Sequence, residues 1–326
     1  MKTRKLGYSD LNLTTLGLGT WAMGGGDWKF GWGPQDDQAS INAIHAALDQ
    51  GINWIDTAAI YGHGKSEEVV GKAINGIRDS VIIATKCGRI WEGNSKEIGK
   101  SLKTDSIRRE VEASLKRLNI DVIDLYQIHW PEPDAEIEEG WHTISNLIKE
   151  GKIRYGGVSN FNLDQLKRAQ AIHPIASLQP PYNMLRREIE TDIIDYCREN
   201  QIGIVAYSPM QAGLLTGKFT EDRARSLPDS DWRSRHPFFN GRQLEINLQM
   251  VEELREIANA AKISLAQLSL AWVLRHKEMT SAIVGARNPA QIEETAKAAA
   301  IELDSAQIDR IEKILANREQ LLTNDQ

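Results

Sequence analysis

Eight short apolar runs alternate with segments of helical periodicity, and this alternation constrains the fold more than any other feature of the chain. Neighbouring parallel strands need a connection long enough to return to the same edge of the sheet, and a helix supplies it. Eight strand and helix units therefore predict a (β/α)8 barrel, the TIM barrel, in which the sheet closes on itself. The expected strands cover residues 16–19, 52–56, 81–85, 122–129, 153–159, 175–179, 202–208 and 281–285.

The segments between these runs carry apolar residues three and four positions apart, as one face of a helix requires. In the first of them Ile41, Ile44 and Leu48 share a face. We expect Thr104 and Asn288 to cap two of the other helices. The expected helices cover residues 36–51, 65–74, 104–118, 136–150, 163–171, 188–200 and 289–299, with an extra C-terminal helix near 305–316.

Two segments lie outside the alternation. Residues 2–6 and 12–15 flank a Tyr-Ser-Asp turn and predict an N-terminal β-hairpin across the floor of the barrel. Residues 208–244 contain Pro228, Pro237 and scattered arginines, and predict a long functional loop after the seventh strand. A doubly wound open sheet is the main alternative fold, but its phosphate-binding sequence, GxGxxG directly after the first strand, is missing.

Length and charge favour one soluble domain over residues 1–326 that binds small molecules. The formal net charge of −6 disfavours broad attraction to nucleic acid or anionic lipid. The start of the chain lacks the apolar core of a signal peptide, and no later segment approaches membrane-spanning length, so no membrane partner is expected. Cys87 and Cys197 lack the spacing of a disulfide framework or a metal site, which favours a reducing, cytoplasmic setting.

Polar residues follow three successive strand runs, at the end of the barrel where catalytic groups lie. Asp56 ends the run INWID, and Tyr61 lies in the loop beyond it. Lys86 follows VIIAT, and His129 follows LYQI. A tyrosine pKa of about 10 is too high for proton exchange near neutral pH, and we expect the Lys86 ammonium to lower it. Asp56 would keep Lys86 charged, His129 would set the geometry, and Tyr61 would protonate a carbonyl that receives a hydride.

Six motifs follow one another along the chain: DTAAIYGHGKSEE (56–68), TKCG (85–88), QIHWPEP (127–133), GVSNF (157–161), LQPPYN (178–183) and YSPMQAGLLTGKF (207–219). In this order they resemble the aldo-keto reductase family over essentially residues 5–300. The similarity is greatest to the branch of bacterial general stress proteins and potassium-channel β-subunits. The resemblance implies that Asp56, Tyr61, Lys86 and His129 are the catalytic tetrad for reversible reduction of aldehydes and ketones. Because the histidine is present, carbonyl reduction is favoured over the carbon–carbon double-bond reduction of relatives with Glu there.

The resemblance also implies a nicotinamide cofactor, which needs polar groups for its carboxamide and a flat surface behind its ring. Ser159, Asn160 and Gln179 match the family's carboxamide contacts. Tyr207 matches the ring that stacks on the nicotinamide, and the loop at 208–244 would cover the cofactor. The other implied contacts are Gly19, Thr20, Trp21, Asp56, Ser208, Pro209, Met210, Gly213, Leu214 and Lys218.

The adenosine end of the cofactor is expected after the eighth strand. Gly285 and Arg287 precede a helix N-terminus, where amides, the helix dipole and a guanidinium favour a phosphate. This segment resembles the family's site for the 2′-phosphate, so Arg287 favours NADPH over NADH. Gln291 and Glu294 would contact the adenosine, whereas Thr295 stands where the family often has Asn.

The sequence also permits two other functions, and its tryptophans indicate where the substrate pocket lies. Lys86 at a barrel strand end also suits Schiff-base chemistry. An NADP-binding redox-sensing or regulatory subunit with slow turnover would share the same fold and tetrad. The seven histidines form no recognised ligand motif, so no metal is expected, and the sequence leaves the physiological substrate and the oligomeric state open. The expected apolar walls of the pocket are Trp21, Trp28, Trp32, Trp91 and Trp130.

Overall fold

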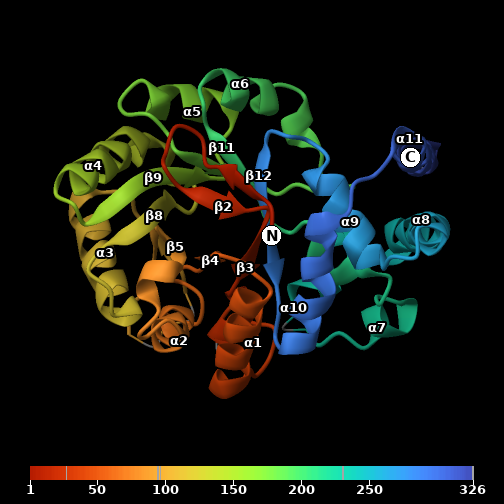
Figure 1. Ribbon diagram of the computed structural model, residues 1–326, viewed down its shortest axis with the longest axis horizontal. Coiled ribbons are helices and arrows are strands. Elements are labelled where there is room, and N and C mark those ends of the chain that lie inside the picture. The colour runs from red at the N-terminus through yellow and green to blue at the C-terminus, as the bar shows by residue number, and fades with distance from the viewer. Residues whose placement is uncertain (27, 94, 96, 230, 325–326) are drawn as a thin grey trace.

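The computed structural model describes residues 1–26, 28–93, 95, 97–229 and 231–324. Eight parallel strands close into a barrel, and helices surround it (Figure 1). The (β/α)8 barrel predicted from the sequence is therefore confirmed. The strands follow one another around the barrel in chain order: β3 (Leu16–Gly19), β4 (Trp54–Asp56), β5 (Ile82–Cys87), β8 (Ile123–Ile128), β9 (Ile153–Ser159), β10 (Ser177–Gln179), β11 (Gly203–Ala206) and β12 (Met279–Gly285).

Helices on the outside bury one face against the strands, and short 3-10 turns join them. The α-helices are α1 (Asp37–Asp49), α2 (Lys65–Ala73), α3 (Thr104–Leu118), α4 (Ile137–Lys149), α5 (Leu163–Gln170), α6 (Ile193–Glu199), α7 (Glu221–Arg225), α8 (Gly241–Ala260), α9 (Leu265–Leu274), α10 (Pro289–Ala296) and α11 (Ser305–Asn324). The 3-10 helices are η1 (Trp21–Gly24), η2 (Arg78–Ser80), η3 (Asp134–Glu136), η4 (Glu188–Glu190), η5 (Gln211–Thr216), η6 (Trp232–Arg235), η7 (Pro237–Phe239) and η8 (Lys297–Ala300).

The structure confirms some of the predicted helix caps and bounds and corrects others. Asn288 caps α10 as expected, since its side chain accepts from the Gln291 amide. Thr104 was wrongly expected to be a cap: it is the first helical residue of α3, and its hydroxyl contacts Thr143. The expected helix at 188–200 is divided into η4 and α6, and the C-terminal helix extends to Asn324.

The segment after β11 contains helices that sequence periodicity missed. Every residue of α9 is buried, so α9 lacks the polar face that marks an amphipathic helix. The segment predicted as a loop at 208–244 carries the short helices η5, α7, η6 and η7, and α8 already begins at Gly241. Among the described residues, no single helix is long and apolar enough to cross a membrane; α8 and α9 pass that test only as a pair, bent by 88°.

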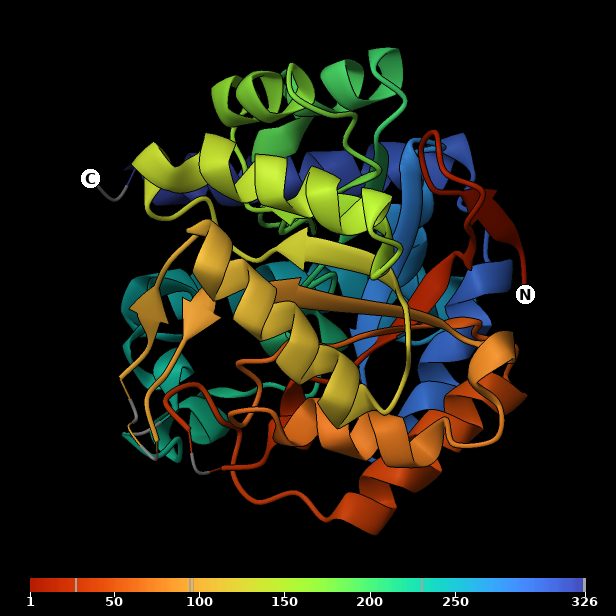
Figure 2. The same ribbon diagram turned by 90° about the vertical axis from the view of Figure 1, so that its left-hand side faces the viewer.

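Two hairpins lie at opposite ends of the barrel, as Figure 2 shows from the side. The expected N-terminal hairpin consists of β1 (Thr3–Lys5) and β2 (Asn12–Thr14), paired antiparallel. Leu6, Leu11 and Leu13 from this hairpin region are buried against the apolar floor of the barrel. The other hairpin, β6 (Arg89–Ile90) with β7 (Gly99–Lys100), follows β5 and was not predicted, because its strands have only two residues each.

Alternate residues of each strand point into the barrel, so the interior is built in layers. Trp54 and Leu125 belong to the apolar layer over the floor, and their side chains are almost fully buried. Asp56 lies two residues beyond Trp54, and Gln127 lies two residues beyond Leu125, in register with Lys86. These three polar side chains form a buried layer above the apolar one. The strands thereby raise charged groups to the C-terminal end of the barrel and keep water out beneath them.

Gly17 makes room for the largest side chain of the apolar layer. A methyl group at Gly17 would lie 1.9 Å from an indole carbon of Trp54. The Trp54 indole is also fixed by a hydrogen bond, in which Nε1 donates to Ser281 Oγ at 3.1 Å. Neither the ring nor its neighbours can move away without breaking this packing.

We expect Gly17→Ala to lower the free energy of unfolding by about 1–3 kcal/mol through overpacking. Urea denaturation followed by far-UV circular dichroism measures the change. Gly285→Ala is the control, because a methyl group there meets no atom within 4 Å. Equal stability of the two variants would contradict the packing argument.

Candidate active site

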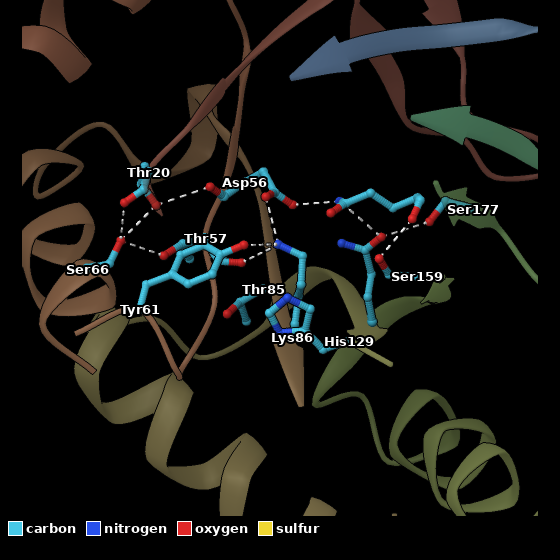
Figure 3. A network of polar contacts seen from close by, with 12 residues as sticks. Thr20, Asp56, Thr57, Tyr61, Ser66, Thr85, Lys86, His129, Ser159 and Ser177 are labelled. Carbon is cyan, nitrogen blue, oxygen red and sulfur yellow. Dashed lines mark hydrogen bonds and ion pairs between the residues drawn. The ribbon is translucent and has the colours of Figure 1, made fainter. Parts of the chain in front are cut away.

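A cavity of about 1020 Å³ opens at the C-terminal end of the barrel, between the strand ends and the loops that follow them. Asp56, Tyr61 and His129 line its floor. Ser159, Asn160 and Gln179 follow from the next strands around the barrel. Polar side chains from separate strands, among them Asp56, His129 and Ser159, therefore converge on one site (Figure 3). Cavities of this kind are the usual location of active sites in (β/α)8 barrels.

Lys86 lies beneath this floor and organises it. Its ammonium donates to Asp56 Oδ2 at 2.7 Å, to the Thr57 carbonyl oxygen at 2.9 Å and to the Tyr61 hydroxyl at 3.4 Å (Figure 3). The other carboxylate oxygen of Asp56 accepts from Gln179 Nε2 at 2.8 Å. The Lys86 side chain is 0 % exposed and that of Asp56 is 4 % exposed, so this ion pair is shielded from water.

Burial decides the protonation of the groups around the ion pair. It lowers the pKa of Lys86, and the neighbouring Asp56 carboxylate opposes that change. It raises the pKa of Tyr61 well above its ordinary value, and the charge of Asp56 adds to the increase. Burial, with the charges of Lys86 and Arg89, holds the pKa of His129 well below its ordinary value. At neutral pH the site therefore contains a neutral phenol and a neutral imidazole.

The direction of the Tyr61 shift corrects the sequence-based expectation that Lys86 lowers the pKa of this phenol. Tyr61 is only 8 % exposed, and its ring stacks on Trp21 with centroids 6.0 Å apart. The Trp28 ring lies 5.9 Å away, and the His129 ring meets Tyr61 edge-on at 5.8 Å. In this apolar setting the cost of desolvating a phenolate exceeds the attraction of the ammonium. The sequence could not show how completely the indoles surround the ring.

Backbone contact between two glycines sets the position of the Tyr61 loop. Gly62 has a φ of +63°, and a methyl group on it would lie 2.1 Å from the Gly24 carbonyl oxygen. The loop after β4 thus packs directly on η1, which carries Trp21. This close approach brings the Trp21 ring into its stacked position beside the Tyr61 ring.

The residues expected at the carboxamide site form one hydrogen-bonded group. Ser159 Oγ donates to the Gln179 carbonyl oxygen at 2.8 Å. Asn160 Nδ2 donates to the His129 carbonyl oxygen and to Ser159 Oγ, both at 3.0 Å. The Tyr207 hydroxyl donates to Asn160 Oδ1 at 2.9 Å. Asn160 is held in the left-handed region, with a φ of 64°, by these contacts.

The far end of the cavity is built by β12, α10 and the segment after β11. Gly285, Arg287 and Gln291 line it, and Lys218 forms an ion pair with Glu294 at 3.0 Å. At the start of α10 the Arg287 amide donates to Gln291 Oε1 at 2.7 Å, and Asn288 caps the helix by accepting from the Gln291 amide. Among the described residues, no group of three or more His, Cys, Asp and Glu side chains could hold a metal ion.

Two comparisons of sequence decide the family. A model of the Aldo/keto reductase family matches residues 15–316. The chain belongs to the aldo/keto reductase family. It is 40% identical to "Aldo-keto reductase YhdN" of Bacillus subtilis (strain 168), over 97% of this chain and 94% of that protein. It is 36% identical to the "NADH-specific methylglyoxal reductase" of Escherichia coli (strain K12), over 94% of this chain and 96% of that protein.

Solved structures of aldo/keto reductases share the fold. The glycerol dehydrogenase AKR11B4 from Gluconobacter oxydans has a TM-score of 0.89 and 37% identity, over 97% of this chain and 96% of that chain. An aldo/keto reductase from Klebsiella pneumoniae in complex with NADP and acetate has a TM-score of 0.73 and 29% identity, over 96% and 95%. The chain is therefore an oxidoreductase of a family that acts on carbonyl groups.

The structure of this aldo/keto reductase places most predicted site residues at the cavity and a few away from it. The four expected catalytic side chains lie together, and their roles remain predictions. Leu214 does not line the cavity, since it is fully buried against Phe219 and Phe239. Trp91 does not line it either, and stacks on His63 at 5.3 Å. The predicted residues that do line it are Gly19, Thr20, Trp21, Trp28, Trp32, Asp56, Tyr61, His129, Trp130, Ser159, Asn160, Gln179, Tyr207, Ser208, Pro209, Met210, Gly213, Lys218, Gly285, Arg287, Gln291 and Glu294.

Sequence reasoning missed the groups that hold these residues in place. Arg233, in the segment after β11, lines the cavity and pairs with Asp231 at 2.6 Å. Gln35, before α1, bonds Arg287. Glu110, on α3, accepts from the Gly88 amide at 2.8 Å. Each is a polar residue outside the six motifs, so neither periodicity nor a motif marks it as part of the site.

Glu110 holds the turn that follows Lys86. Its second oxygen accepts from the Ser106 hydroxyl at 3.1 Å, and burial raises its pKa to about 7. The proton is therefore bound more tightly in the folded chain than in the unfolded one, where the pKa is near 4.5. The folded state loses stability as the pH rises from about 4.5 to 7, because the buried carboxyl must ionise.

We expect Glu110→Gln to remove this loss, because the amide keeps an acceptor for Gly88 and cannot ionise. Relative to the wild type, the variant should gain up to about 3 kcal/mol of unfolding free energy between pH 5 and pH 8. Urea denaturation at several pH values measures the difference. A constant difference between the two proteins across this range would show that Glu110 is not the group that titrates.

Proposed function

We propose that this aldo/keto reductase catalyses the reversible, NADPH-dependent reduction of aldehydes and ketones to alcohols, with Tyr61 as the proton donor. One observation carries the proposal. The Tyr61 hydroxyl, at the cavity floor, lies 3.4 Å from a buried ammonium that forms an ion pair with Asp56. This arrangement suits a phenol that gives up a proton and is left as a phenolate beside a fixed positive charge.

The shape and chemistry of the cavity fit a nicotinamide dinucleotide. Its volume of about 1020 Å³ is at the upper end for small-molecule sites. Ser159, Asn160 and Gln179 offer amide and hydroxyl groups for a carboxamide at one end. Arg287 offers a cation at the other, and Gly285 leaves open space, since a methyl group there meets nothing within 4 Å. When bound, a reduced nicotinamide supplies the hydride.

The chain's own residues handle the proton and the developing charge. Tyr61 Oη holds a proton in the resting site, because burial keeps its pKa high. It gives that proton to the carbonyl oxygen, and Lys86 Nζ stabilises the phenolate that remains. Neutral His129 donates a hydrogen bond to the same carbonyl oxygen and fixes its direction. Tyr61 and its neighbouring indoles exclude water from the reacting atoms.

Schiff-base chemistry at Lys86 has less support. The Lys86 side chain is 0 % exposed, and its ammonium already donates to Asp56, Thr57 and Tyr61. A carbonyl carbon in the cavity would have to displace Tyr61 to reach the nitrogen. Lys86 therefore serves better as a fixed charge than as a nucleophile.

Small carbonyl compounds are the proposed substrates. Trp21, Trp28 and Trp130 give the mouth of the cavity apolar walls, and one relative is named a methylglyoxal reductase. NADPH is proposed as the preferred cofactor because Arg287 lies at the adenosine end, and the Klebsiella pneumoniae structure was solved with NADP. We further propose that the protein works in the cytoplasm, because both of its cysteines are free thiols.

We expect Tyr61→Phe to lower kcat for methylglyoxal and for an aromatic aldehyde by roughly a hundredfold or more, since only the proton donor is removed. The decrease in NADPH absorbance measures turnover, and quenching of tryptophan fluorescence should show unchanged NADPH binding. Tyr8→Phe is the matched control, because Tyr8 packs against Tyr155 and its hydroxyl donates to Pro174 at the opposite end of the barrel. Near-normal turnover by Tyr61→Phe would refute the assignment.

We expect Arg287→Ala to raise the Kd for NADPH roughly ten- to hundredfold, because a charged hydrogen-bond donor to the 2′-phosphate is lost. The Kd for NADH, which has no such phosphate, should change by less than about threefold. Arg225→Ala, on an exposed part of α7 outside the cavity lining, controls for loss of a surface charge. An equal increase in the Kd values for NADPH and NADH would show that Arg287 does not contact the 2′-phosphate.

A further inference from the structure

The loop before α1 crosses to the start of α10 and is bound there by Arg287. We call residues 32–35 the strap. Arg287 Nε donates to Gln35 Oε1 at 2.7 Å, and Gln35 Nε2 donates back to the Arg287 carbonyl oxygen at 3.0 Å. Arg287 Nη1 donates to the Trp32 carbonyl oxygen at 3.3 Å, and Nη2 donates to that of Pro34. The strap thus accepts a hydrogen bond from each of the three guanidinium nitrogens.

A second arginine holds the other end of the strap. The Arg233 guanidinium lies 4.9 Å from the centre of the Trp32 ring. Arg233 is itself fixed by its ion pair with Asp231. Trp32, Arg233 and Arg287 all line the cavity, so the strap forms part of the wall at its adenosine end. Helices α1 and α10, which begin at the strap and at Arg287, pack side by side (Figure 1).

The partners of Arg287 are all neutral. Three of the five N–H donors of a guanidinium are used on amide oxygens. In the part of the chain that the structure describes, no carboxylate forms an ion pair with Arg287. A phosphate is a stronger acceptor for a guanidinium than an amide oxygen, because its negative charge adds ionic attraction and its oxygens can accept two parallel N–H bonds. A ligand phosphate at this end and the strap therefore need the same donors.

We propose that Gln35 is a specificity-determining residue, which competes with the 2′-phosphate of NADPH for Arg287. This competition raises the Kd for NADPH and leaves that for NADH unchanged, so the preference for NADPH becomes smaller. The inference rests on the proposed function, since it assumes that the dinucleotide lies in this cavity. NADPH must displace Gln35 from Arg287 to reach the guanidinium. NADH carries a 2′-hydroxyl and leaves the strap in place. Gln35 is the side chain that makes this contact, whereas Trp32 and Pro34 use backbone oxygens that substitution does not remove.

Titration of each purified variant with NADPH and with NADH, followed by tryptophan fluorescence, tests the proposal without requiring turnover. For Gln35→Ala we expect the Kd for NADPH to fall about three- to tenfold, the effect of removing one competing hydrogen bond. The Kd for NADH should stay within about twofold of the wild type. Gln35→Glu should act in the opposite direction and weaken NADPH binding, because its carboxylate would pair with Arg287. Gln38→Ala, an exposed glutamine on α1 that bonds Asn42, is the matched control and should change neither Kd.

The double variant Gln35→Ala/Arg287→Ala identifies the contact through which Gln35 acts. In the Arg287→Ala background, the added Gln35→Ala change should leave the Kd for NADPH unaltered, as a double-mutant cycle requires of one shared interaction. If Gln35→Ala weakens the binding of NADPH and of NADH equally, the strap supports both cofactors and does not compete with the 2′-phosphate, and the proposal is overturned. An unchanged ratio of the two Kd values overturns it as well. Failure of the wild type to bind either cofactor would instead refute the proposed function.

Discussion

The ion pair between Lys86 and Asp56 is almost completely removed from water, and the active site depends on how fully its charges are satisfied. Burying two charges costs several kcal/mol each unless their hydrogen bonds are complete. Here the ammonium has three oxygen partners, and each carboxylate oxygen has a donor. Loss of either partner would leave an unpaired charge in the barrel, so the pair fixes the positions of Tyr61 and Gln179 as well as its own.

The barrel makes such a pair possible by separating an apolar floor from a polar layer. Side chains two residues apart on a strand point the same way, so Trp54 lies below Asp56 and Ala84 below Lys86. The N-terminal hairpin seals the floor with leucines. Water therefore reaches the charged layer only from the cavity, and the indoles of Trp21 and Trp28 restrict that route.

Loops that are distant in sequence complete the site around this centre. The close contact of Gly24 and Gly62 places Trp21 over Tyr61. The strap, Arg233 and Arg287 join segments from three strand ends at the opposite side of the cavity. The rigid barrel thus supports the proton-donating group, while contacts between loops shape the part of the cavity that would select a cofactor.

The sequence by itself determined the barrel, the strand ends and the four polar residues expected to act together. This was possible because helix and strand periodicity are local, and because parallel strands bring their C-terminal ends to one edge. Only the tertiary structure decided that burial raises the pKa of Tyr61, that Trp91 stacks on His63 and does not line the cavity, and that Gln35 binds Arg287. It also revealed α9, whose buried surface on all sides leaves no periodic pattern. Desolvation and contacts between distant loops depend on which groups surround a side chain, and no local pattern of residues records those neighbours.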